Sequence, residues 1–101
     1  MNILKIVNGK VEFRAKTGAL IRTFNHGKAI LADINSAQDK ILITYDNGKV
    51  ELRRETGALI TTIVSSKAVD ARFSGNDILV RFSTGKAELR RETGGLIRTL
   101  S

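Results

Sequence analysis

Residue types that often build catalytic or metal-binding sites are missing or rare in this chain of 101 residues. It has no cysteine and no tryptophan, and its single histidine is His26. Without cysteine there is neither a disulfide nor a thiolate metal site, and one histidine cannot build a histidine-based zinc site within one chain. We therefore expect no cofactor. Because no nucleophile has a base partner, the sequence also predicts no enzyme, and His26 is expected at the surface.

Long apolar runs are also missing. A stretch such as residues 41–43 is far too short to span a bilayer, and residues 1–7 lack the pattern of a signal peptide. The expected setting is therefore cytoplasmic, without a membrane partner. Proline is absent as well, and the glycines stand at turn positions rather than inside apolar runs.

Acidic residues are fewer than basic ones. The chain has 17 Lys and Arg against 10 Asp and Glu, which gives a formal net charge of +7. This balance attracts polyanions such as nucleic acid or an acidic protein, or it serves only to keep the surface solvated. Aromatic residues for base stacking number only four Phe and one Tyr, and core packing claims most of them. Nucleic-acid binding is therefore the weaker interpretation of the charge.

An internal repeat organises the whole chain. The segment G-K-A-E-L-R-R-E-T-G-G-L-I-R-T-L at residues 85–100 recurs with changes at residues 48–63 and 9–24, at offsets of 37 and 39 residues. Such a unit cannot bury its apolar face alone, so neighbouring units must stack. We predict one domain of three units, at residues 3–27, 28–66 and 67–101.

The pattern within each unit predicts an all-β chain. Short β-branched runs alternate with turn residues, no long segment carries a helical apolar stripe, and Asn8-Gly9 is a strong hairpin signal. We expect three strands in the first unit and four in each of the others. The predicted strands are 3–7, 10–15, 20–24, 29–34, 41–45, 49–55, 59–64, 68–73, 78–82, 86–92 and 96–100.

The third unit resembles a β-propeller blade of the WD-repeat type. Its inner strand ends in Phe73-Ser74, and Thr93-Gly94 turns into the outer strand, as in that family. Residues 28–63 fit the same template, and the first unit enters it at the second strand. The Trp-Asp pair that names the family is replaced by arginine pairs, and no Gly-His pair precedes the inner strand. The resemblance implies three four-stranded antiparallel blades, of which the first lacks its innermost strand.

The continuous apolar runs at residues 41–43 and 78–80 suit strands that lie between stacked blades. Three blades cannot close a ring, and an open arc would expose two apolar blade faces. We therefore expect a homodimer in which two chains join head to tail into a six-bladed ring. The predicted function is that of a self-assembling scaffold or binding module.

Two other folds build three four-stranded units, namely the β-trefoil and the β-prism of bulb-type lectins. Residues 76–82 with Gly94-Gly95 faintly resemble the sugar-binding repeat of these lectins, whose Gln, Asn and Tyr are not reproduced apart from Asp39 and Tyr45. The alternative is therefore a small basic protein that binds a polyanion, a nucleic acid or a glycan.

Two groups of charged residues are candidates for function. The arginines of the third strands could bind phosphates or acidic side chains, or they could form a ladder of Arg–Glu pairs between blades, which the glutamate in every unit favours. The inner strands carry aspartate and arginine side chains that we expect to form an ion pair closing the central channel. The candidate contacts are Arg53, Arg54, Arg90, Arg91, Glu51 and Glu88, and the candidate channel residues are Asp33, Asp70 and Arg72.

Overall fold

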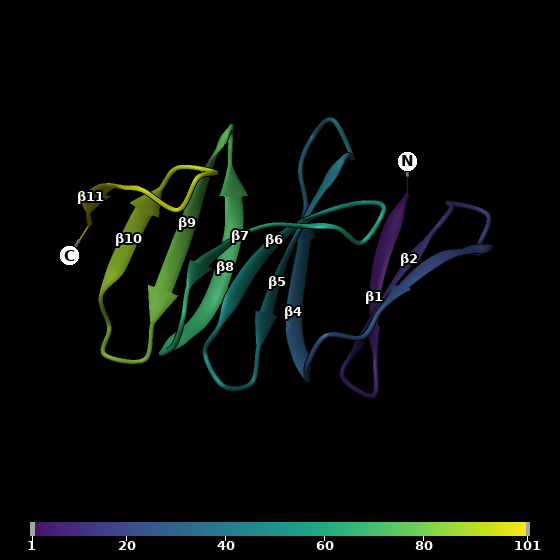
Figure 1. Cartoon of the computed structure of the whole chain (residues 1–101), viewed down its shortest axis with the longest axis horizontal. Helices are drawn as coiled ribbons and strands as arrows, with labels where there is room; N and C mark the ends of the chain where they lie inside the picture. Colours follow the sequence, from purple (N-terminus) through teal and green to yellow (C-terminus); the bar gives the residue numbers. More distant parts are fainter. Residues whose placement is uncertain (1, 101) are drawn as a thin grey trace.

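The computed structural model describes residues 2–100, in which three antiparallel sheets and no helix are present (Figure 1). The first sheet consists of β1 (Ile3–Val7), β2 (Lys10–Arg14) and β3 (Leu20–Phe24). The second consists of β4 (Ala29–Ile34), β5 (Lys40–Tyr45), β6 (Val50–Arg54) and β7 (Leu59–Val64). The third consists of β8 (Ala68–Ser74), β9 (Asp77–Phe82), β10 (Ala87–Arg90) and β11 (Leu96–Thr99). The all-β prediction of three, four and four strands is confirmed. Met1, and Ser101 at the end of the third predicted unit, lie outside the described residues.

The three sheets are propeller-like blades, and each is built from strands that are neighbours in the sequence. We call them the first, second and third blades. They follow one another along the long axis of a molecule that measures 40 × 26 × 19 Å (Figure 1). Strand β4 contacts both β1 and β8, so the inner strands form the line along which the blades meet. The six-bladed ring stays a prediction.

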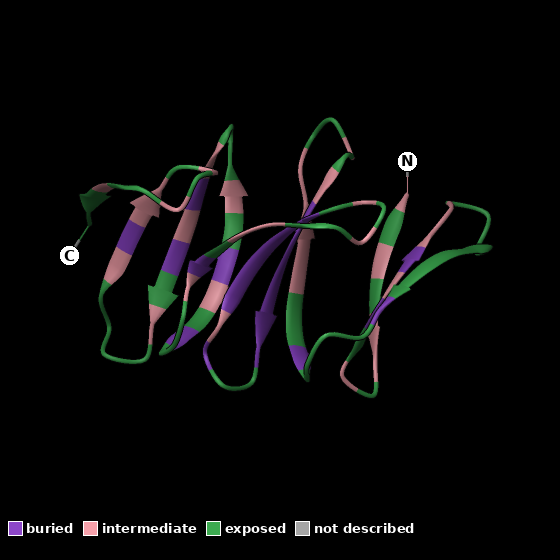
Figure 2. Cartoon of the chain, in the orientation of Figure 1, coloured by how far each residue is buried: buried purple, intermediate pink, exposed green. Residues whose placement is uncertain are grey.

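Two apolar cores fill the spaces between the blades, and strand β5 serves both. Its side chains alternate, so Ile41 and Ile43 face the first blade while Leu42 faces the third. This double burial explains the unbroken apolar run, and Figure 2 shows the buried residues concentrated on β5 and β6. The first core consists of Val11, Phe13, Phe24, Ala29, Ile41, Ile43 and Tyr45. The second core consists of Leu42, Val50, Leu52, Ile63, Ala68, Ala71, Ile78 and Val80.

Strands β2, β6 and β10 are shorter than predicted. Strand β6 ends at Arg54 because a turn begins there: Gly57 donates its backbone N–H to the carbonyl of Arg54, and Arg54 donates to Ala58. The same turn follows β2 and β10. These turns take the residues that the sequence pattern assigned to the strand ends.

The first hairpin has a turn that is one residue shorter than the turns of the other two. Asn8 and Gly9 both have a positive φ, of 52° and 79°, and form a two-residue turn between Val7 and Lys10. As a result Lys5 lies opposite Glu12, whereas in the second blade Ile43 lies opposite Glu51, the counterpart of Glu12. A lysine therefore stands on the outer face of the first blade where the second blade has an isoleucine.

The two outer faces of the arc consequently differ in chemistry. Leu79 and Ala87 on the third blade line an open groove of about 470 Å³, together with Val69 and Leu100. Their counterparts in the second blade, Leu42 and Val50, are completely buried in the second core. The groove on the third blade has an apolar floor with Arg81 and Lys86 also in its lining, while Lys5 adds a charge to the outer face of the first blade.

The inner edge of the first blade has no strand on it among residues 2–100, as the sequence predicts for a unit without its innermost strand. Beside this edge, Asn2 donates its backbone N–H to the side-chain Oε1 of Gln38, at 3.1 Å. Gln38 belongs to the connection between β4 and β5, so this loop covers the start of the edge.

Candidate functional site

A charge clamp recurs in every blade, on strands β2, β6 and β10. In the second blade, Arg53 donates from Nε to Oε1 of Glu51 at 3.0 Å and from NH1 to the carbonyl of Gly57 at 2.8 Å. The turn that presents this carbonyl has Gly57 at φ +99°, a region that favours glycine. The other clamps are Glu12, Arg14 and Gly18 in the first blade and Glu88, Arg90 and Gly94 in the third.

The clamps explain why glutamate and arginine recur together in the repeat. Residues two apart on a strand share one face, so the Arg–Glu pair lies within a strand and not between blades as a ladder would require. One ion pair does join two blades: Lys40 Nζ lies 3.0 Å from Oε1 of Glu92. Arg54 and Arg91 are exposed and have no ion pair within residues 2–100.

The clamp of the second blade is the most buried. Tyr45 donates its hydroxyl to Glu51 Oε1 at 2.6 Å, and Lys49 Nζ lies 3.0 Å from Oε2. Burial opposes ionisation, but the hydrogen bonds from Tyr45, Arg53 and Lys49 outweigh it and lower the pKa of Glu51 to about 2. Burial and the bond to Glu51 raise the pKa of Tyr45. The nearby His26 has a lowered pKa, because burial and the charge of Arg53 disfavour its protonation.

The three candidate channel residues line a small hollow of about 260 Å³ between β4 and β8. Arg72 pairs with Asp70 on its own strand, with 2.9 Å between NH2 and Oδ2. Asp33 instead accepts the backbone N–H of Phe73 at 2.8 Å. The structure therefore brings the three residues together, with the ion pair inside one strand and Asp33 linking two blades.

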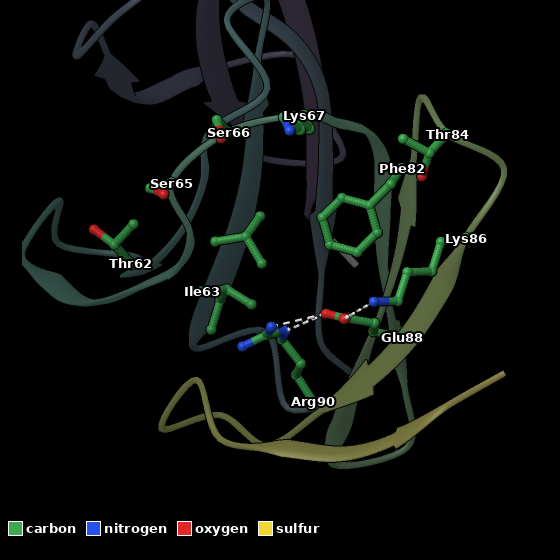
Figure 3. A pocket seen from close by; sticks show the side chains of 11 residues that line it. Thr62, Ile63, Ser65, Ser66, Lys67, Phe82, Thr84, Lys86, Glu88 and Arg90 are labelled. Carbon is green, nitrogen blue, oxygen red and sulfur yellow. Dashed lines mark hydrogen bonds and ion pairs between the residues drawn. The ribbon is translucent and has the colours of Figure 1, made fainter. Parts of the chain in front are cut away.

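A larger pocket of about 660 Å³ lies between the second and third blades (Figure 3). Ile63 and Phe82 form its apolar part, and Ser65 and Ser66 lie along the loop that leads from β7 to β8. The carboxylate of Glu88 points into the pocket, so the third clamp forms one wall.

Glu88 is ionised in this setting. Burial opposes its ionisation, but Arg90 and Lys86 more than compensate and lower its pKa. Arg90 NH2 lies 2.7 Å from Glu88 Oε1, and Lys86 Nζ lies 3.4 Å from Oε2. At neutral pH the pocket therefore contains a carboxylate that can only accept hydrogen bonds.

The sequence identified Glu88 and Arg90 as candidates but not the other residues of this pocket. A signal was present at the repeat positions: the first unit has Phe24 and His26 where the second has Ile63 and Ser65. The sequence alone does not show that these positions line one space, because their side chains come from different strands and loops that meet only at the blade interface.

Comparison with known protein families and with curated proteins gives no match. Among solved structures, the C-terminal WD40 domain of Sif2 is similar, with a TM-score of 0.70 and 16% sequence identity. The match covers 92% of this chain and 31% of the other, so this chain spans about a third of that domain's length. The expected WD-repeat-like blades are thus confirmed at the level of the fold, and their arrangement is that of a β-propeller rather than of a β-prism or a trefoil.

No helix in residues 2–100 has the length and apolar character needed to cross a bilayer.

Proposed function

We propose that this chain is a non-catalytic scaffold or binding module, in which two copies join head to tail into a six-bladed ring inside the cell. The likeness to a WD40 domain supports a propeller-type binding module. The proposal assigns no catalytic activity because the sequence offers no nucleophile with a base partner. The self-assembly would join the outer face of the third blade to the outer face of the first.

The observation that supports the ring is that two repeat positions carry opposite charges in different blades. Within the chain, Lys40 of the second blade pairs with Glu92 of the third. Asp77 stands in the third blade at the repeat position of Lys40, and Lys16 stands in the first blade at the position of Glu92. When a third blade meets the first blade of another copy in the same geometry, Asp77 lies opposite Lys16. In this contact the acid would come from the third blade and the base from the first, which is the reverse of the Lys40–Glu92 pair. Opposite charges would still face each other, so the contact would be attractive.

Apolar burial acts in the same direction. The groove on the third blade holds Leu79 and Ala87 at positions whose second-blade counterparts are buried under the next blade. A second copy would bury them too, since a soluble chain gains from covering such a face. Lys5 on the opposing face limits this gain. Its ammonium group must either lose its hydration in the contact or extend beyond the edge of the contact into solvent. We therefore expect a reversible dimer, weaker than the contacts between blades of one chain.

Charge reversal tests the ring. Light scattering should give a mass about twice 11.1 kDa for the unchanged protein at high concentration. Asp77→Lys and Lys16→Glu should each raise the dimer dissociation constant about tenfold, and the double variant should restore it, because like charges face each other only in the single variants. Asp46→Lys, at an exposed turn of the second blade, is the matched control. A monomer at every concentration, or single variants that dimerise as well as the double variant, would sink the ring.

A second candidate function is polyanion binding, which the exposed and unpaired Arg54 and Arg91 favour. Both residues follow a clamp arginine directly, so the clamp leaves them available for phosphate or carboxylate groups. Affinity for single-stranded nucleic acid should then fall steeply between 50 and 200 mM salt, by about tenfold or more. Binding that is insensitive to salt would favour a glycan or exclude this function.

A further inference from the structure

The pocket between the second and third blades has a filled counterpart between the first and second blades. There Phe24 and Tyr45 are only 2% and 4% exposed. The ring of Phe24 also meets the ring of His26 edge to face, with 6.5 Å between the centroids. Phe24 and Tyr45 therefore fill the earlier interface, and the exposed His26 covers the ring of Phe24 at its border; we call these three residues the plug.

The pocket lacks all three parts of this plug. Ile63 replaces Phe24, Ser65 replaces His26, and Phe82 replaces Tyr45. Each replacement removes a ring or a hydroxyl from the same region of the blade interface. The open space of about 660 Å³ falls within the size range of small-molecule sites.

The hydrogen bonding changes in parallel. In the first interface, the hydroxyl of Tyr45 donates to Glu51 at 2.6 Å. Phe82 has no hydroxyl, so within residues 2–100 Glu88, the counterpart of Glu51, has only the contacts with Arg90 and Lys86. Figure 3 shows the two partners on opposite sides of the carboxylate: Arg90 contacts Oε1, and Lys86 lies 3.4 Å from Oε2. A carboxylate has about four lone-pair sites, so these contacts leave Oε2 the freer oxygen. Glu88 is therefore a buried acceptor that faces the pocket with capacity for one more donor.

We propose that this pocket binds a hydroxylated aromatic ring, which packs against Ile63 and Phe82 while its hydroxyl donates a hydrogen bond to Glu88. The ring would replace the missing plug, and the phenol would reproduce the bond that Tyr45 makes to Glu51. Either a free phenol or a tyrosine side chain of a partner offers this chemistry. An anionic group such as a phosphate is disfavoured beside the ionised Glu88, because Arg90 and Lys86 already pair with it and Lys67, which also lines the pocket, is exposed to solvent. The proposal does not depend on the six-bladed ring, because one chain supplies the whole pocket.

The test compares ligands that differ by one hydroxyl. We would titrate the protein with N-acetyltyrosine amide and with N-acetylphenylalanine amide and follow the backbone amide signals of Ser65, Phe82 and Glu88 by NMR. The tyrosine derivative should bind about tenfold more tightly, since only its hydroxyl satisfies Glu88. p-Cresol in parallel separates the sources: equal affinity points to a free phenol, whereas a higher affinity for the tyrosine derivative points to a peptide.

Rebuilding the plug provides the matched variant. Ile63→Phe combined with Ser65→His and Phe82→Tyr copies the first interface into the second, so it should abolish binding of the tyrosine derivative and raise the melting temperature. The single change Phe82→Tyr should weaken binding about tenfold because the new hydroxyl occupies Glu88. Equal affinity for the two derivatives, or undiminished binding by a folded triple variant, would overturn the proposal.

Discussion

Replacing Gly48 with alanine is expected to separate the third blade from the second and to cost about 3 kcal/mol or more in the free energy of unfolding. A Cβ atom at Gly48 would overlap the backbone nitrogen of Lys67 and would lie 2.9 Å from its Cα. Neither atom can move alone, because Gly48 also accepts the backbone N–H of Ala68 at 3.0 Å. The turn of one blade is thus seated directly on the first residues of the next inner strand.

Gly85 supplies the matched control. It occupies the same place in the third blade and has nearly the same φ, +89° against +87°, but nothing lies within 4 Å of its added Cβ. Gly85→Ala should therefore cost only the backbone strain, about 1 kcal/mol. Urea denaturation of the two variants measures the difference. Equal losses would show that blade contact is not the reason for glycine at position 48.

Replacing Glu51 with glutamine is expected to lower the free energy of unfolding by about 3 kcal/mol at neutral pH, because it leaves Arg53 without its buried partner. Glu51 accepts hydrogen bonds from Tyr45 and Arg53 and pairs with Lys49. Glu12→Gln is the control, since the same clamp in the first blade is more exposed and such pairs contribute about 0–1 kcal/mol.

The pH dependence of stability tests the same clamp without a mutation, because acid removes the charge of Glu51. The pKa of Glu51 falls from 4.5 to about 2 on folding, so its stabilising effect is complete above pH 4.5 and is lost as the pH falls toward 2. The urea midpoint of the unchanged protein should therefore drop between pH 5 and about pH 2. Glu51→Gln should show a smaller drop. Parallel curves for the two proteins would mean that Glu51 is not the group whose protonation destabilises the fold.

The strand pattern was readable from the sequence because turn residues and apolar residues carry local information. Asn8-Gly9 and the Thr-Gly pairs mark the turns, and the double-sided apolar run at 41–43 marks a strand between two blades. The turn at Asn8-Gly9 was predicted, but the effect of its shorter length on the position of Lys5 was not. The shorter length depends on which residues of the turn take a positive φ, and it moves Lys5 to the outer face.

The side-chain partners were less accessible to sequence reasoning. Alternation placed Glu51 and Arg53 on one face, but it did not decide whether an arginine would reach along its own strand or across to another blade. The structure settles the geometry because the carbonyl of Gly57 lies within reach of Arg53 and holds it against Glu51. The pocket beside Glu88 arises from three separate replacements in different strands and loops, so only packing reveals it.

The pairing of every strand with its sequence neighbour also governs how the protein forms. Each backbone ladder closes a short loop, which keeps the entropy lost before the first contacts small and favours rapid folding. During synthesis the first blade can pair its three strands at once, but its apolar side must await Ile41, Ile43 and Tyr45 of the second. We therefore expect the blades to fold in the order of synthesis, with each new blade covering an apolar side of the one before it.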